Sequence, residues 1–545
     1  MTERTLPPGP PSGRRGPRTV LLRGGAVYSP ADPFATAMLV EGEHIAWVGS
    51  DGAAEAYTAT ADEIVELDGA LVTPAFVDAH VHATAAGLAL TGLDLTGSPS
   101  LAAALAAVTA FVDRSEPGGV LIGHGWDESG WPEGRPPTLA ELDAAARGAA
   151  LYLSRTDVHS ALATTALRTL TEGLAERPGH HPEGPLAKDA HHAVRQTALA
   201  RLTPEQRRRA QRATLARAAE LGIGALHECA GPEISSEQDL AALLALAADQ
   251  EGPEVFGYWG ELGGVETARR LGAVGAGGDL FVDGAFGSRT ACLHTPYTDA
   301  EHTGTAYLSA EQVADHVAAC TEAGLQAGFH AIGDAAVAAV VEGVRAAGER
   351  VGAGRVKALR HRVEHAEALD DESVAAFAEL GLTASVQPAF DAAWGGPEGM
   401  YVQRLGAERA AALNPFAALL RAGVPLAFGS DAPVTPLDPW GTVRAAAFHR
   451  TPEHRISVRA AFTAHTRGGW RAIGRDQDGV LVPGAVASYA IWAAGDLVVQ
   501  APDSRVAGWS TDPRSGTPGL PDLTPGHPLP VCLRTVVRGR TVHQG

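Results

Sequence analysis

The sequence predicts an α/β protein built around a (β/α)8 barrel of the TIM type, with eight parallel strands. Between residues 74 and 460, short apolar runs alternate with Ala- and Leu-rich stretches of helical character, such as 312–323 and 371–380. This alternation is typical of βα units around a parallel sheet. Both ends of the chain carry only short β-like segments, at 20–48 and 489–542. They indicate a small β-sandwich domain formed from both termini.

Eight apolar runs in the central region qualify as barrel strands. They cover residues 71–82, 224–228, 255–261, 280–285, 326–330, 362–365, 383–387 and 426–431. In a barrel of this kind the active site lies at the C-terminal ends of the strands. Polar residues at those ends are therefore the first candidates for function.

The pattern divides the chain into four parts. Residues 1–18, rich in Pro, Gly and Arg and without an apolar core, are expected to be a disordered tail and not a signal peptide. Residues 19–73 and 461–545 form the sandwich, and 74–83 with 206–460 form the barrel. Residues 84–205 are too long for one loop and contain strand-like runs at 120–123 and 150–153. This insertion follows the first barrel strand, so we expect it to be a substrate cap.

Composition narrows the class of partner. Among the 545 residues, 43 are basic and 63 acidic, which gives a net charge of −20. This balance argues against nucleic acid or an anionic membrane as a partner and leaves a small-molecule substrate. The four cysteines have no CxxC spacing, which favours free thiols in a reducing compartment and a cytoplasmic location. No apolar run is long enough to span a membrane, and a homodimer is the expected assembly on base rates.

The segment 72–82 ends an apolar run with His80 and His82. Residues two apart in a strand point to the same face, so both imidazoles can reach one metal ion. Other predicted strands end in His227-Glu228, Asp283, His330, Glu364-His365 and Asp431. Histidine and carboxylate ligands suit Zn²⁺ or a similar divalent ion, with bonds of roughly 2.0–2.2 Å.

Five strings in this order resemble the amidohydrolase superfamily, and within it the amidohydrolase 3 branch of YtcJ-like and N-substituted formamide deformylase-like hydrolases. The strings are TPAFVDAHVH at 73–82, DGAFGSRTA at 283–291, GFHAIGD at 328–334, RVEHA at 362–366 and GSDAPV at 429–434. The resemblance covers residues 19–545. It implies a distorted barrel beside a β-sandwich built from both chain ends, as the alternation of elements also predicts.

The resemblance also implies residue roles. His80, His82, His330 and His365 match metal-ligand positions, and Asp431 matches a ligand that serves as general base for the attacking water. A bound metal lowers the pKa of its water toward about 7 and polarises the scissile carbonyl. A carboxylate beside that water can take its proton and pass it to the leaving nitrogen. His365 is the alternative partner for the developing oxyanion if it is not a ligand.

One departure from the family pattern concerns the number of metal ions. Many relatives bridge two metals with a carboxylated lysine on the fourth strand, but residues 278–283 contain no lysine. Either the site holds one ion, bound by His80, His82, His330 and Asp431 with His365 nearby, or a carboxylate takes the bridging place. Asp283, Asp279 and Glu228 are the candidates for that place. We expect one ion, most simply Zn²⁺.

Substrate contacts are less constrained by the sequence. Ser288 and Arg289, after the predicted fourth strand, could face the substrate, as could Gln387 before Pro388. In the insertion, Trp126 and His159 could contact substrate or only pack the cap.

These features predict a metal-dependent hydrolase of non-peptide carbon–nitrogen bonds, acting on an amide, N-acyl or N-formyl compound through metal-activated water. One alternative is a deaminase of a ring amine, which uses a mononuclear site with the same ligand types. Another is a non-catalytic scaffold, which would be expected to lack histidines at the strand ends.

Overall fold

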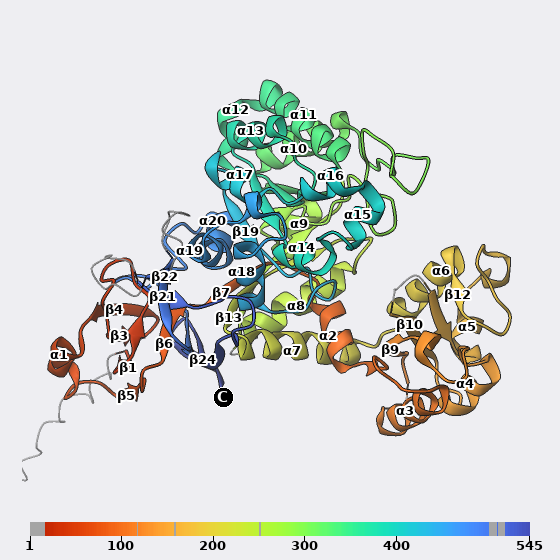
Figure 1. Ribbon diagram of the computed structural model, residues 1–545, viewed down its shortest axis with the longest axis horizontal. Helices are drawn as coiled ribbons and strands as arrows, with labels where there is room; N and C mark the ends of the chain where they lie inside the picture. Colours follow the sequence, from red (N-terminus) through yellow and green to blue (C-terminus); the bar gives the residue numbers. More distant parts are fainter. Residues whose placement is uncertain (1–16, 117, 157–159, 250–251, 501–508, 511–517) are drawn as a thin grey trace, which may run out of the picture.

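The computed structural model describes residues 17–116, 118–156, 160–249, 252–500, 509–510 and 518–545. A barrel occupies the centre of the molecule, with a β-sandwich on one side and the insertion on the other (Figure 1). The predicted disordered tail, residues 1–18, lies outside the described residues except for Pro17 and Arg18.

The barrel sheet contains eight strands. In chain order they are β7 (Phe76–Val81), β13 (Ile223–Ala230), β14 (Glu254–Trp259), β15 (Gly275–Ala276), β16 (Gln326–Ala331), β17 (Arg362–His365), β18 (Thr383–Val386) and β19 (Leu426–Phe428). Each strand pairs in parallel with the next, and a parallel bridge from Val81 to Ala432 brings the last strand near the first. The strands are buried throughout, apart from the first half of β14, as expected for a sheet covered by helices. The predicted (β/α)8 fold is confirmed.

Fifteen helices among the described residues belong to the barrel or pack on it. They are α2 (Ala83–Thr91), α7 (Pro204–Glu220), α8 (Glu237–Asp249), α9 (Val265–Leu271), α10 (Ala310–Ala323), α11 (Asp334–Val351), α12 (Ala353–Ala358), α13 (Asp371–Leu380), α14 (Pro388–Trp394), α15 (Met400–Leu405), α16 (Ala407–Ala411), α17 (Phe416–Arg421), α18 (Pro439–Ala447), α19 (Val458–Thr463) and α20 (Gly469–Ala472). Helices α7 and α10 begin with capping boxes, at Thr203 with Gln206 and at Ser309 with Gln312. None of the helices in the described residues has the length and apolarity that a membrane span needs.

Two predicted strands differ from the observed ones. The run 71–82 is divided at Ala75 into β6 (Leu71–Pro74), which belongs to the sandwich, and β7 of the barrel. The fourth barrel strand is β15, at 275–276, and not the predicted segment 280–285. Gly277 and Gly278, with φ of 154° and 83°, break the strand, and beyond them only Phe281 pairs with the sheet, through a bridge to His330. The apolar pattern correctly predicted that this segment is buried, but it did not predict that the two glycines end the strand before it.

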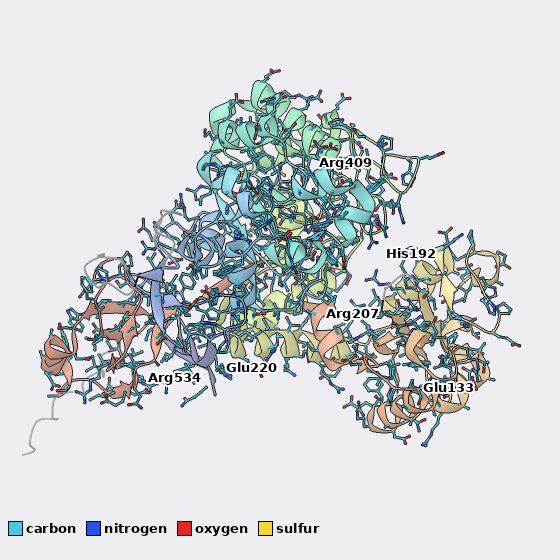
Figure 2. All side chains as sticks on the ribbon, viewed as in Figure 1. Glu133, His192, Arg207, Glu220, Arg409 and Arg534 are labelled. Atoms are coloured by element: carbon cyan, nitrogen blue, oxygen red, sulfur yellow. The ribbon has the colours of Figure 1, made fainter. Side chains whose placement is uncertain are left out.

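Both ends of the chain build the sandwich. One sheet contains β4 (His44–Gly49), β3 (Ala37–Glu41), β1 (Thr19–Arg23) and β5 (Glu63–Glu66), and the other contains β2 (Ala26–Val27), β6, β20 (Tyr489–Ala493), β24 (Val531–Val537) and β25 (Arg540–Gln544). Their common core includes Leu22, Val40, Val72, Tyr489 and Val536. Arg534, labelled in Figure 2, joins the sheets through an ion pair with Glu63. A small sheet of β21 (Leu497–Gln500), β22 (Trp509–Ser510) and β23 (Leu520–Pro521) and the short helix α1 (Asp51–Ala54) complete the terminal elements.

The insertion has a sheet and core of its own. Its strands are β8 (Leu93–Asp94), β9 (Leu121–Trp126), β10 (Leu151–Arg155), β11 (Ser160–Ala163) and β12 (Leu186–Ala187), and its helices are α3 (Leu101–Arg114), α4 (Leu139–Ala146), α5 (Thr165–Leu170) and α6 (Lys188–Ala200). Figure 1 shows it beside the barrel, reached through α2 and α7. Arg207 on α7, labelled in Figure 2, donates to Leu199 of α6 and to Ser236 before α8. It therefore ties the insertion to the barrel.

Candidate metal centre

Six side chains meet at the C-terminal ends of the barrel strands. They are His80 on β7, His82 after it, Asp279 after β15, His330 on β16, His365 on β17 and Asp431 after β19. Asp279 Oδ2 lies 3.4 Å from His80 Nε2 and 3.2 Å from His82 Nε2. Asp279 Oδ1 lies 3.4 Å from both His330 Nδ1 and His365 Nε2. Asp431 Oδ1 lies 3.1 Å from His82 Nε2. The strand ends thus bring four imidazoles and two carboxylates to one place.

Each of the four imidazoles uses its outward nitrogen in a hydrogen bond to an oxygen outside the cluster. These bonds join His80 Nδ1 to Glu364 Oε2 (2.8 Å), His82 Nδ1 to the Cys229 carbonyl (3.0 Å), His365 Nδ1 to Gln387 Oε1 (2.8 Å) and His330 Nε2 to the Gly284 carbonyl (3.2 Å). An oxygen acceptor fixes the proton on the nitrogen that faces it, so the other ring nitrogen presents a lone pair. Metal-ligating histidines are held in this way by their surroundings.

The inward atoms are buried without hydrogen-bond partners among the described residues. This group comprises His80 Nε2, Asp279 Oδ1, His330 Nδ1, His365 Nε2 and Asp431 Oδ1. Leaving so many buried polar atoms unsatisfied is costly, and a bound cation would supply the missing partners. Bonds of about 2.0–2.1 Å in tetrahedral geometry place neighbouring ligand atoms roughly 3.3 Å apart, and the distances measured here are 3.1–3.6 Å. The donor set therefore fits a divalent metal.

Both carboxylates of the cluster are ionised. Burial by itself would raise the pKa of Asp279, but the imidazoles of His80, His330 and His365 around it hold that pKa well below its usual value. The pKa of Asp431 is also lowered, because the neighbouring imidazoles, that of His82 first, outweigh the effect of burial. The site thus offers negative charge to a cation at neutral pH.

The buried ion pair of Arg362 and Glu364 holds the ring of His80 in position. Arg362 and Glu364 lie two residues apart on β17, so both face the barrel interior, and Arg362 Nη2 donates to Glu364 Oε2 at 2.9 Å. Burial would raise the pKa of Glu364, but Arg362 and His80 lower it to about 2. Glu364 is therefore a permanent acceptor for the ring of His80.

Two of the cluster residues have a strained backbone. His365 has φ of 68° and Asp431 has φ of 55°, in the left-handed region that residues other than glycine rarely occupy. Such conformations cost of order 1–3 kcal/mol each and are found at functional sites where the surroundings hold them in place. Here they turn the chain at the strand ends.

Asp283 and Glu228, the other predicted bridging candidates, lie outside the cluster. Asp283 accepts hydrogen bonds from the backbone N–H groups of Cys292, Ile332 and Gly333. Glu228 Oε2 accepts from the backbone N–H of Ala83 at 2.7 Å, at the start of α2. Burial raises the pKa of Glu228 to about 7. Both carboxylates hold loops around the site, and of the three candidates the structure brings only Asp279 into it.

Among the predicted substrate contacts that the structure describes, Gln387 is the one that touches a cluster residue, through its hydrogen bond with His365. Arg289 pairs with Asp299, and the Ser288 hydroxyl lies 2.6 Å from the Thr290 hydroxyl. Trp126 is buried in the core of the insertion, where its indole N–H donates to the Leu153 carbonyl. His159 lies outside the described residues.

Of the groups that hold the imidazoles, the sequence assigned a role only to Gln387, as a substrate contact. Glu364 and Arg362 could have been found, because two charged residues at alternate positions of an apolar strand share one buried face. The carbonyls of Cys229 and Gly284 belong to the backbone and leave no signal in the side-chain pattern.

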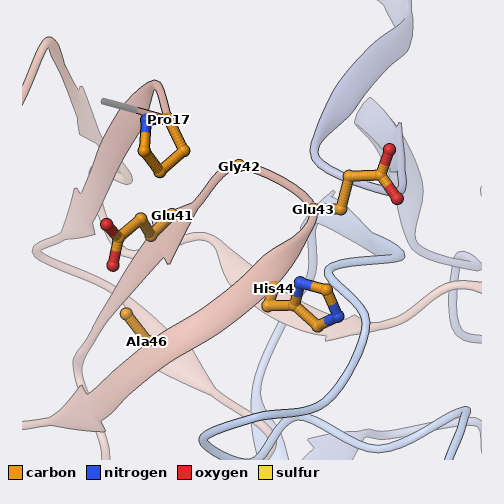
Figure 3. Close-up of a pocket in the computed structure, with 6 residues that line it drawn as sticks. All are labelled: Pro17, Glu41, Gly42, Glu43, His44 and Ala46. Carbon is orange, nitrogen blue, oxygen red and sulfur yellow. The ribbon is translucent and has the colours of Figure 1, made fainter. Parts of the chain in front are cut away.

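A shallow hollow of about 490 Å³ lies far from the metal centre, at the turn between β3 and β4 of the sandwich (Figure 3). It is lined by Pro17, Glu41, Gly42, Glu43, His44 and Ala46. Its lining contains one imidazole and two glutamate carboxylates. It therefore lacks the cluster of imidazoles that makes the barrel site a candidate for metal binding.

The sequence model of the amidohydrolase family matches residues 63–543. The chain belongs to the amidohydrolase family. The family predicted from the five strings is therefore confirmed, and so is the prediction of a hydrolase. The scaffold alternative is set aside, because it predicts that histidines are missing from the strand ends, and the structure brings four of them together there.

Several known proteins resemble the chain over most of its length. Protein LONG AFTER FAR-RED 3 of Arabidopsis thaliana is 28% identical, over 87% of this chain and 86% of its own. The YtcJ protein of Bacillus subtilis (strain 168) is 25% identical, over 96% and 99%. The N-substituted formamide deformylase of Arthrobacter pascens is 24% identical, over 82% and 87%. The crystal structure of an uncharacterized metal-dependent hydrolase from Pyrococcus furiosus superimposes with a TM-score of 0.73 at 26% identity, covering 87% of this chain and 98% of that one.

Proposed function

We propose that this amidohydrolase uses a divalent metal, with Zn²⁺ the first candidate, to hydrolyse a non-peptide carbon–nitrogen bond in an amide, N-acyl or N-formyl compound. The observation that carries the proposal is the orientation of the four imidazoles. Each is fixed by an outside acceptor, and the freed nitrogens converge on two ionised carboxylates. A metal bound there would supply Lewis acidity and an acidified water.

Asp431 is the proposed proton carrier. Its Oδ1 lies 3.1 Å from His82 Nε2 and is buried without a hydrogen-bond partner among the described residues. Because its pKa is lowered, the group is a carboxylate at neutral pH, and only this form can accept a proton from water and pass it to the departing nitrogen. His80, His82, His330 and His365 would hold the metal.

The substrate class is supported by the formamide deformylase among the relatives and by the chemistry of the site. A metal that polarises a carbonyl next to a proton-transfer carboxylate suits acyl transfer to water. The insertion is the proposed cap, because α2, which leads to it, begins at the residue after His82. It would select among amides by shape.

Metal content and a substrate panel test the function directly. The purified chain is expected to contain stoichiometric divalent metal and to release amines from a panel of N-formyl and N-acyl amines. Ammonia released from aminated rings, with no cleavage of the amide panel, would favour the deaminase alternative. A chain without metal, and inert after Zn²⁺ or Mn²⁺ is added, would contradict the proposal.

Asp431→Asn tests the proton carrier. We expect this variant to keep most of its metal, because Asn retains an oxygen ligand, and to lose turnover by about 10²–10⁴-fold, as general-base variants do. Asp68→Asn is a matched control, since Asp68 is exposed in a turn of the sandwich with φ of 50°, which Asn tolerates. A near-normal rate in Asp431→Asn would remove Asp431 from proton transfer.

A further inference from the structure

The carboxylate of Asp279 stands between two pairs of imidazoles. Its Oδ2 lies 3.4 Å from His80 Nε2 and 3.2 Å from His82 Nε2. Its Oδ1 lies 3.4 Å from His330 Nδ1 and 3.4 Å from His365 Nε2. One oxygen of Asp279 therefore contacts one pair of imidazoles and the second oxygen contacts the other pair, which is the arrangement of a carboxylate shared between two cations.

The backbone before Asp279 is built to bring this short side chain inward. After β15 ends, Gly277 and Gly278 adopt φ of 154° and 83°. A Cβ on Gly277 would lie 2.1 Å from the backbone nitrogen of Gly328 on β16. On the other side, a Cβ on Gly260 would lie 2.8 Å from the carbonyl carbon of Asp279. Only glycines permit the chain to pass so close to its neighbours, and the result is that one methylene suffices to reach the cluster.

The chain has no lysine that could supply a longer bridge. Its two lysines are Lys188, at the start of α6 in the insertion, and Lys357 on α12, whose Nζ donates to the Glu379 carbonyl. A carboxylated lysine needs carbon dioxide as well as the side chain. The side chain of Asp279 already carries a carboxylate, so it needs no reaction with carbon dioxide.

We propose that Asp279 bridges two divalent cations directly, so that the pair assembles without carbon dioxide. His80 and His82 hold one cation, and Asp431 Oδ1, at 3.6 and 3.1 Å from their Nε2 atoms, completes its ligands. His330 and His365 hold the other. Two cations on one carboxylate stand about 3.5–4 Å apart. The inference rests on the proposed metal-dependent function and extends it to the number of ions and the identity of the bridge.

The single-ion alternative uses part of the same cluster. The arrangement expected from the sequence binds one ion with His80, His82, His330 and Asp431. That arrangement would leave Asp279 Oδ1 and His365 Nε2 buried without partners among the described residues. The bridged pair satisfies both.

Metal titration of the full chain distinguishes the two arrangements. Metal-free protein in buffer purged of carbon dioxide is titrated with Mn²⁺, and bound metal is measured by elemental analysis and electron paramagnetic resonance. The expected result is two Mn²⁺ per chain with a spin-coupled spectrum, unchanged by added bicarbonate. One Mn²⁺ with the spectrum of isolated ions, or a second ion that binds only with bicarbonate, would overturn the bridge.

Asp279→Asn tests the bridging residue itself. A carboxylate offers two oxygens, one to each cation, but an amide offers only one, so this variant is expected to bind at most one Mn²⁺ and to lose the coupled spectrum. Asp68→Asn, on the exposed turn, should bind two. Coupled ions in Asp279→Asn would assign the bridge to another group, whatever the wild-type stoichiometry.

The titration uses no substrate, so its outcome is separate from that of the proposed reaction. Two coupled ions in a chain that cleaves no amide would keep the bridge and remove the proposed substrate class. Amide cleavage by a chain with one ion would keep the proposed substrate class and remove the bridge.

Discussion

At the scale of single residues, the metal centre is defined as much by what surrounds the imidazoles as by the imidazoles themselves. Glu364, Gln387 and two backbone carbonyls each take one ring nitrogen. A histidine free to rotate would lose conformational entropy when a metal binds, whereas these rings are already oriented. Metal affinity should therefore depend on residues that never touch the metal.

Gln387→Leu is the simplest test of that dependence. The change removes the acceptor of His365 Nδ1–H but keeps a side chain of similar size, so metal affinity should fall by about 10–100-fold. Gln387→Glu retains an oxygen acceptor and should bind metal at least as well as the wild type. Competition with a metal-binding dye measures both constants. Equal affinity in Leu and Glu variants would mean that the contact between Gln387 and His365 does not position the ring.

The same scale shows what the sequence could and could not predict. His80, His82, His330, His365 and Asp431 were predicted from their places at strand ends, and the structure brings them together. Asp279 was only one of three bridging candidates, because the side-chain pattern does not show how far Gly277 and Gly278 displace the backbone. Its selection needed three-dimensional geometry.

At the scale of elements, close helix contacts join the insertion to the barrel. Helices α2 and α7 meet at Gly87, where a Cβ would lie 1.8 Å from the carbonyl oxygen of Ala210. Only glycine allows the two backbones to approach so closely. The linkage between the two parts of the chain is therefore a rigid helix pair and not a loose linker.

Gly87→Ala should separate that pair. Because the added methyl group meets backbone, which cannot move aside as a flexible side chain can, we expect a loss of about 1–3 kcal/mol. Faster amide hydrogen exchange along α2 and α7 should accompany it. Gly52→Ala is the control, since nothing lies within 4 Å of its Cβ position on the exposed helix α1. Unchanged exchange in Gly87→Ala would show that α2 and α7 tolerate a wider separation.

Elements were predicted with uneven success, for identifiable reasons. The predicted helix at 371–380 coincides with α13, because Asp370 caps its start and Gly381 ends it in the left-handed conformation. The predicted fourth strand was displaced, because two glycines end the pairing before the apolar run begins. Apolar periodicity locates burial, but hydrogen-bonded pairing depends on backbone conformation.

At the scale of the whole molecule, metal and fold are linked. Buried inward atoms lack partners among the described residues until a cation is bound, so the native chain gains stability from metal that the unfolded chain does not. The outside acceptors, in contrast, hold the rings with or without metal. Removal of the metal should weaken the barrel without dissolving it.

Chelation tests this linkage. The metal-free protein should unfold at a lower temperature, with its far-ultraviolet circular dichroism at 20 °C retained, and the difference should grow with free metal. One site contributes about 2.7 kcal/mol at a free metal concentration of about 100 times Kd. Calorimetry across a series of metal buffers measures the slope. A melting temperature that ignores metal concentration would show that the cluster binds none in the native state.

The division of the first predicted strand at Ala75 joins distant parts of the chain. Strand β6 pairs with β20 and runs on, after one residue, into β7, which carries His80. Strand β20 is in turn held by β24, near the carboxyl end. Proteolytic removal of β24 would thus leave β20 and β6 less firmly held, next to the strand that carries His80. Damage at the carboxyl end would therefore change catalysis at the distant metal centre.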